Sequence, residues 1–324
     1  MNFLEYVKPS DVLAIVLYDN DYQQHTKSIK HLLTLCNHLH VYQNEPIGAE
    51  DSTNFANFIK INDYPSITYY ADCVLNFSLE RAKFIPHVRW FIDEINYYTA
   101  TNWGQQLLKN LLYTYNKPYK FDMLLGAWRP HRDFLWHHYQ SNAIIKNNTI
   151  ATYFKDNLSN GVWLSWANPT LHSCKFSGDI FSINGEEARA SAVIPLDIYN
   201  RSYYSIVAET TYYNEYNHYT EKVAKPILAQ RPFVVFAGQY YLKNLKKLGF
   251  KTFDPIIDES YDNIPNNIQR WTQAMKQVER LCTLNPVDVI TSLKSILEFN
   301  QHYFLSTDWM LPTKNLNFLT DSSL

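Results

Sequence analysis

The sequence predicts an α/β fold with two domains, each built on a parallel sheet flanked by helices, and with further helices at the carboxyl end. Three observations lead to this prediction. Short continuous apolar runs, typical of strands buried on both faces, alternate with helical stretches. The length of 324 residues favours two domains of ordinary size. In the last third, apolar residues recur at spacings of three and four, as they do in long helices.

The amino-terminal half alternates strands and helices. An apolar run over 11–18 ends at the polar group Asp19-Asn20-Asp21, which indicates a strand followed by a loop. Asn44-Glu45-Pro46 closes a later strand, because proline and the residue before it disfavour regular structure. The elements expected here are strands at 11–18, 40–43, 67–70 and 73–76 and helices at 27–39 and 88–99.

The alternation breaks around Asn116-Lys117-Pro118, so we place the domain boundary near residue 115, with domains at 1–115 and 116–324. Residues 157–187 are polar and lack a clean period, which indicates an insertion or irregular loop. Because strand and helix alternate in both halves, both are expected to be Rossmann-like. The second half is predicted to contain strands at 121–126, 202–209, 232–237 and 251–253 and helices within 210–231 and at 240–248, 265–281 and 287–304.

Composition excludes several classes of function. With 29 basic and 31 acidic residues the net charge is −2, so no overall field attracts nucleic acid or an anionic membrane. The four cysteines are far apart and form no zinc or disulfide pattern. No basic leader precedes an apolar core, and no run reaches the roughly 18 apolar residues of a spanning helix. We therefore expect a soluble cytoplasmic protein with no metal site, no integral membrane segment and no nucleic-acid partner.

A short polar motif, Thr220-Glu221-Lys222, precedes a helical stretch that contains Pro226. Proline is tolerated only in the first helical turn, so the helix is expected to begin close to Lys222 and to present these residues at its positive end. Such an end favours an anion. The alternative interpretation is an ordinary amino-terminal cap by Thr220, which stabilises a helix by about 1 kcal/mol.

Two arginines, Arg129 and Arg132, follow the first strand of the second half, and Pro130 sets the turn between them. Ligands of doubly wound sheets bind at the carboxyl ends of the strands, and the arginine fork matches phosphate oxygens. We therefore expect one or both arginines to contact a phosphate. The alternative is a solvated turn that leads into the outer face of a helix.

The stretch from Ser205 to Phe250 resembles a known family. It contains Ala208-Glu209-Thr210 at a strand end, then His218-Tyr219-Thr220-Glu221-Lys222, a helical signal and the apolar run 232–236. This order is similar to the donor-binding core of the fucosyltransferase-like glycosyltransferases, whose viral and bacterial members carry a Tyr-Thr-Glu-Lys loop. The resemblance covers roughly residues 120–262. It implies the GT-B architecture of two Rossmann-like domains and a single inverting displacement without a metal or other cofactor.

The resemblance also implies roles for individual residues. Arg132 and Lys222 would contact the donor diphosphate, and Glu221 would meet donor hydroxyls. Glu209 resembles the glutamate of the family's Phe-Glu-Asn-Ser element, although Ala208-Glu209-Thr210-Thr211 replaces that element here. Tyr219 adjoins the loop, and its ring could stack on a base or a sugar. The predicted donor-binding set is Arg129, Arg132, Glu209, Tyr219, Thr220, Glu221 and Lys222.

The acceptor hydroxyl needs a general base, and Glu45 is the candidate. It follows a strand, where functional side chains of doubly wound sheets gather, and related transferases place an acid after an early strand. The alternative is a surface glutamate in a turn. Asp19-Asn20-Asp21 is similar to the metal-binding Asp-x-Asp of another glycosyltransferase architecture, but such triplets arise easily after strands and the cationic loop offers charge compensation without a metal.

These features predict a glycosyltransferase that moves a sugar from a nucleotide sugar, possibly a GDP-fucose-like donor, to a glycan or another hydroxyl acceptor. The altered surroundings of Glu209 leave an alternative open, in which a carbohydrate-binding or host-interaction protein has kept the fold and lost catalysis. Affinity for a nucleotide sugar would distinguish the two.

Overall fold

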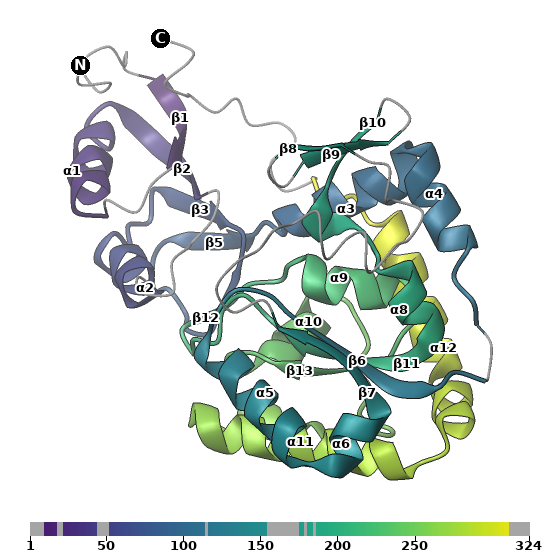
Figure 1. Ribbon diagram of the computed structural model, residues 1–324. Helices are drawn as coiled ribbons and strands as arrows, with labels where there is room; N and C mark the ends of the chain where they lie inside the picture. Colours follow the sequence, from purple (N-terminus) through teal and green to yellow (C-terminus); the bar gives the residue numbers. More distant parts are fainter. Residues whose placement is uncertain are drawn as a thin grey trace. The chain divides into compact units, whose positions relative to one another are not determined.

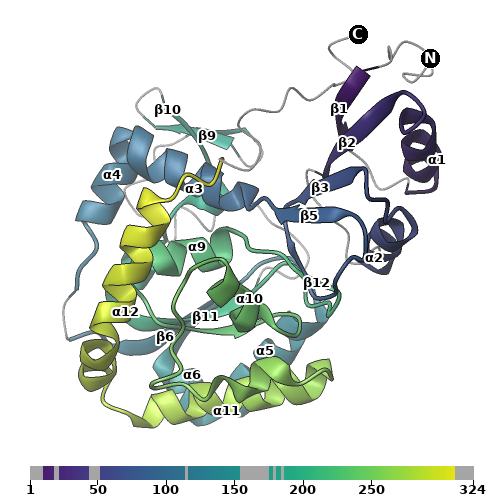
Figure 2. The same cartoon turned by 180° about the vertical axis from the view of Figure 1, so that it is seen from behind.

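The computed structural model describes residues 10–17, 22–43, 52–113, 116–153, 175–177, 180–183 and 186–310. The chain divides into two compact units. The first comprises Met1–Arg89, Tyr213–His218 and Asp308–Leu324, and the second comprises Trp90–Tyr212 and Tyr219–Thr307. Figures 1 and 2 show the elements of each unit from two sides. The predicted mixed α/β fold with helix-flanked parallel sheets is confirmed.

The first unit is built on a four-stranded parallel sheet in the order β1-β2-β3-β5. Alternate strand residues such as Leu13, Leu39 and Ile67 form a buried cluster with Ile29 and Phe55 from the two helices, so both helices cover the same face. The strands of this sheet are β1 (Ser10–Leu17), β2 (Cys36–Gln43), β3 (Ile67–Ala71) and β5 (Lys83–Pro86), and the two helices are α1 (Tyr22–Leu32) and α2 (Ser52–Ile61).

A two-stranded antiparallel ribbon completes this unit. In it β4 (Val74–Leu75) pairs with β12 (Tyr216–Asn217), which comes from a segment far along the chain. The Asp72 carboxylate accepts a hydrogen bond from the Arg89 backbone N–H at 2.9 Å and lies 3.0 Å from His218 Nε2. Residues 213–218 are thus integrated into the first unit although the chain on either side belongs to the second.

The second unit is built on a parallel sheet in the order β13-β11-β6-β7. Helices α5, α6 and α11 lie on one face of this sheet and α8 and α9 on the other, with α12 packed on α9 (Figure 1). The sheet and these helices are β6 (Tyr119–Leu125), α5 (Pro130–Ser141), α6 (Ala143–Asn148), β7 (Thr149–Tyr153), α8 (Leu196–Arg201), β11 (Ser202–Ala208), α9 (Glu221–Leu228), β13 (Phe233–Phe236), α11 (Asn267–Thr283) and α12 (Pro286–Ser306).

Further elements surround this core. They are helices α3 (Arg89–Ala100), α4 (Asn102–Lys109) and α10 (Tyr241–Lys247), the 3-10 turns 190–192 and 259–263, and a small antiparallel sheet of β8 (Lys175–Ser177), β9 (Ile180–Ile183) and β10 (Glu186–Arg189). The predicted boundary near residue 115 differs from the division into units, because α3 packs with the second unit. The Phe91 ring contacts Phe250 and Phe304, and the Tyr98 hydroxyl donates to the Ala192 carbonyl.

Three local predictions were wrong in part. The helix expected over 27–39 ends at Leu32, because Leu39 and Val41 are buried in β2 and pair with both neighbouring strands. Residues 251–253 form no strand, since Thr252 and Phe253 instead hydrogen bond to the Glu259 carboxylate. The described part of the expected irregular region 157–187 forms antiparallel strands.

Candidate functional site

A cavity of about 480 Å³ lies in the second unit, where β6, β7 and β11 end. Gly126 and Ala127 follow β6, Thr152 lies near the end of β7, and Thr210 follows β11. Side chains from the start of α9 form another wall. The carboxyl ends of parallel strands are the usual ligand site of a doubly wound sheet, so this cavity is the candidate functional site.

Cationic side chains dominate the charge of this cavity. Its lining includes the basic residues Arg129, Arg132, Lys222 and Lys225 and the acidic residues Asp122 and Glu221. Both acids already contact cations. Asp122 accepts from Arg231 at 2.6 Å and Glu221 accepts from Lys222 at 2.5 Å. A cavity with this balance of charges favours an anionic ligand.

Arg132 is held rigidly in the cavity wall. Its residue is 4% exposed, and its guanidinium donates to the carbonyls of Ala127 at 2.7 Å and Glu209 at 3.3 Å. Burial, and after it the charge of Arg129, lower the pKa of Arg132 to about 10, so the group stays cationic at neutral pH. Because the protein has fixed the guanidinium in place, little conformational entropy is lost when an anion binds.

Arg129 precedes the same helix. It adopts an extended conformation as the N-cap of α5, Pro130 begins the helix, and its guanidinium donates to the Trp128 carbonyl at 2.7 Å. The Nε atoms of Arg129 and Arg132 are buried and have no hydrogen-bond partner within the described residues. Buried donors without partners carry a desolvation cost.

Helix α9 begins at Glu221, close to the predicted start, but Pro226 lies inside the helix and not in its first turn as expected. Thr220 is the N-cap, and its hydroxyl accepts from the Lys222 backbone N–H at 3.3 Å. The Lys222 ammonium donates to the Thr210 hydroxyl at 3.1 Å, and its side chain is 26% exposed. Burial acts to raise the pKa of Glu221, but the charges of Lys222 and Lys225 outweigh it and lower that pKa. Lys222 therefore offers a cation that a ligand can reach.

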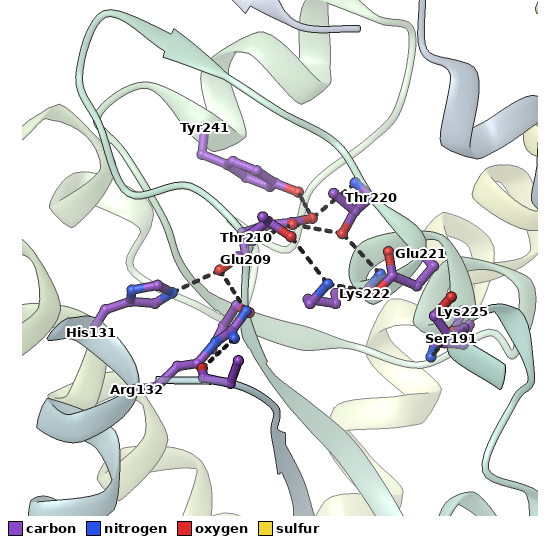
Figure 3. A network of polar contacts seen from close by, with 12 residues as sticks. His131, Arg132, Ser191, Glu209, Thr210, Thr220, Glu221, Lys222, Lys225 and Tyr241 are labelled. Atoms are coloured by element: carbon purple, nitrogen blue, oxygen red, sulfur yellow. Dashed lines mark hydrogen bonds and ion pairs between the residues drawn. The ribbon is translucent and has the colours of Figure 1, made fainter. Parts of the chain in front are cut away.

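Glu209 closes the loop that joins β11 to α9 (Figure 3). Its residue is fully buried. Its carboxylate accepts hydrogen bonds from the Thr210 N–H at 2.9 Å, the Thr220 N–H at 3.1 Å, the Thr220 hydroxyl at 2.7 Å and the Tyr241 hydroxyl at 2.9 Å. One side chain thus holds both ends of the segment that contributes β12 to the first unit.

Tyr219 is part of the same buried group. Its hydroxyl donates to the Tyr241 carbonyl at 2.8 Å, and its ring packs on Tyr241 and Phe91. The residue has no exposed surface and does not line the cavity. Its ring therefore packs in the protein interior in this structure.

The structure brings some of the predicted site residues together. Arg129, Arg132, Glu221 and Lys222 line one cavity. Glu209, Tyr219 and Thr220 lie behind its wall and bond to each other or to Tyr241. Glu45 lies outside the described residues, as do Asp19, Asn20 and Asp21.

Sequence reasoning missed Lys225. It is buried, donates to the Ser191 carbonyl at 2.6 Å and lines the cavity one turn after Lys222. Burial lowers the pKa of Lys225. The spacing of three residues from Lys222 could have indicated a shared helix face. Glu94 on α3 is also fully buried, and burial raises its pKa well above its usual value.

Two further polar groups had no local signal in the sequence. Arg231 and Asp122 form a buried ion pair between residues 109 apart, and the Arg231 guanidinium lies 4.1 Å from the centre of the Tyr199 ring. His131 donates from Nε2 to the Glu209 carbonyl at 2.8 Å, and burial lowers the pKa of His131 to about 3, so its imidazole is neutral. Both groups support the strands beneath the cavity.

Among the described residues, no set of three or more histidine, cysteine, aspartate or glutamate side chains could hold a metal ion. None of the helices there combines the length and the apolar character that a membrane crossing requires. Comparison of the chain with protein-family models, with curated proteins and with solved structures finds no match.

Proposed function

We propose that the cavity of the second unit binds the diphosphate of a nucleotide sugar and that the protein is a glycosyltransferase. The observation that carries this proposal is the shared lining. Arg132, in the first turn of α5, and Lys222, in the first turn of α9, reach one cavity at the carboxyl ends of parallel strands. The two residues lie 90 positions apart in the chain, so the tertiary fold and not a local pattern brings them to one cavity.

The chemistry of sugar transfer explains why such a cavity is needed. As the bond between the sugar and the diphosphate breaks, negative charge grows on the departing phosphate oxygens. Cationic groups already held in place stabilise that charge more in the transition state than in the ground state. Arg132 and Lys222 are assigned to the diphosphate, with Arg129 and Lys225 adding positive charge. Glu221, beside Lys222, is assigned to donor hydroxyls.

The proposed architecture is GT-B, with the acceptor bound by the amino-terminal domain. Each unit holds a four-stranded parallel sheet flanked by helices, which is the coarse requirement of that architecture. Glu45 is proposed as the general base that deprotonates the acceptor hydroxyl, so that the reaction is a single inverting displacement. Nucleotide sugar and a glycan or other hydroxyl compound are the proposed substrates.

Titration calorimetry with a panel of GDP- and UDP-sugars, in the presence of a chelator, tests the proposal. We expect saturable binding of at least one nucleotide sugar, and weaker binding of the matching nucleoside monophosphate because it lacks one phosphate group. Added salt should weaken the binding, since screening reduces attraction between charges. Binding of free glycans without affinity for any nucleotide would contradict catalysis and support the carbohydrate-binding alternative.

A further inference from the structure

A second cavity, of about 300 Å³, lies in the second unit near the opposite ends of the same strands. Its lining includes Lys117, which precedes β6 in the chain, Tyr203 at the start of β11, and Arg231, which precedes β13. Helix α12 supplies Leu297 and the charged pair Lys294 and Glu298. Its volume is at the lower end of the range for small-molecule sites.

The walls of this cavity are largely aliphatic and aromatic. The lining includes Leu111, Leu297, Ile290, Tyr199 and Tyr203. Gln230 also lines it and adopts a left-handed backbone conformation with φ 50°, which costs a residue other than glycine roughly 1 kcal/mol or more. Such conformations cluster at functional sites.

Lys117 lacks the carboxylate partner that the other charged groups of the lining have. Arg231 pairs with Asp122 at 2.6 Å, and Lys294 pairs with Glu298 at 3.8 Å. The Lys117 ammonium donates to the Tyr199 carbonyl at 2.8 Å and lies 5.8 Å from the centre of the Tyr203 ring. Within the described part of the chain no carboxylate forms an ion pair with it.

We propose that this second cavity binds a small carboxylate with an apolar body, its carboxylate on Lys117 and its hydrocarbon part between Tyr203 and α12. A single ammonium acts as a point charge and suits a singly charged group. Phosphate fits less well, because the arginine that could grip it is engaged. The Arg231 guanidinium already donates to Asp122, to Ser202 and to the Tyr199 carbonyl.

The protonation of Lys117 makes this binding depend on pH. Burial, and after it the charge of Arg231, lower the pKa of Lys117 to about 7, while Asp122 acts in the opposite direction. The remaining charged groups of the lining, Lys294 and Glu298, face it from α12 as a pair. A bound carboxylate favours the charged ammonium, so affinity is greatest below pH 7 and falls above it. The protonated fraction drops from about nine-tenths at pH 6 to about one-tenth at pH 8, which predicts roughly tenfold weaker binding.

Titration of the full chain with benzoate at pH 6 and pH 8 tests this site, with uncharged benzamide as the control probe. The wild type should bind benzoate more tightly at pH 6 by about tenfold and benzamide weakly at both pH values. Lys117→Met should lose benzoate binding. Lys117→Arg should keep it without the pH dependence, because arginine stays charged throughout this range.

Two matched variants separate this cavity from other cationic surfaces. Lys247→Met removes an exposed lysine of α10 that lines neither cavity, and Lys222→Ala removes a cation of the first cavity, so both should bind benzoate as the wild type does. The proposal is overturned if Lys117→Met binds benzoate as tightly as the wild type does, or if Lys222→Ala abolishes benzoate binding. It is also overturned if the wild type, at millimolar ligand concentrations, binds neither benzoate nor isovalerate, a second small carboxylate with an apolar body. None of these outcomes depends on nucleotide-sugar transfer.

Discussion

Lys222→Ala is expected to weaken nucleotide-sugar binding by roughly a hundredfold, which corresponds to about 3 kcal/mol. The Lys222 ammonium lines the first cavity, and its hydrogen bonds within the protein go to Thr210 and Glu221. Truncation removes one cation and leaves the Glu221 carboxylate facing the phosphates without its partner. Both changes disfavour an anion. Calorimetric titration with the tightest nucleotide sugar of the panel measures the effect.

The control for this variant is Lys247→Ala on α10, which removes an exposed lysine from the same unit. It should bind the nucleotide sugar as the wild type does. Because the Lys222 side chain is partly exposed, the alanine variant should unfold at nearly the wild-type urea concentration. Wild-type affinity in a folded Lys222→Ala protein would refute the proposed phosphate contact.

The variant Arg132→Ala is a less specific test of the proposed phosphate contact. Its guanidinium also donates to the Ala127 and Glu209 carbonyls in a buried setting. Arg132→Ala would remove a buried donor from both carbonyls and leave the Glu209 carbonyl with His131 alone, so loss of binding would be mixed with loss of stability. The fold therefore need not stay intact in this variant.

Glu209→Ala is expected to destabilise the protein by about 4 kcal/mol. Its carboxylate is the acceptor for four hydrogen bonds from Thr210, Thr220 and Tyr241. Alanine leaves two backbone N–H groups and two hydroxyls in the interior without that acceptor, and each buried group left unsatisfied costs about 1–3 kcal/mol. Urea unfolding monitored by tryptophan fluorescence should show the transition at a lower urea concentration.

Glu209→Gln is the matched control, because it keeps the shape and removes the charge. Its amide nitrogen would face groups that are themselves donors, so we expect a smaller loss, about half that of alanine. A Glu209→Ala protein within about 1 kcal/mol of the wild type would show that the carboxylate does not hold this loop. The order alanine, glutamine, wild type in rising stability would support the assignment.

The elements with strong local patterns were predictable. The apolar runs at 121–126, 202–209 and 232–237 form β6, β11 and β13, and the proline and spacing signals of the last third mark α11 and α12. The strand β12 was not predicted, because its two residues form a strand only by pairing with β4, which lies within the strand expected at 73–76.

The amino-acid sequence by itself determined the start of α9 and the positions of β6, β11 and β13 in the second sheet. Thr220 caps the helix through its own neighbours, and burial on both faces leaves a continuous apolar run in the chain. Only the tertiary structure decided that Glu209 serves the protein interior, that Asp122 meets Arg231, and that residues 213–218 join the first unit. Hydrogen bonds and ion pairs between distant residues depend on how whole elements pack, and a linear pattern carries no record of that packing.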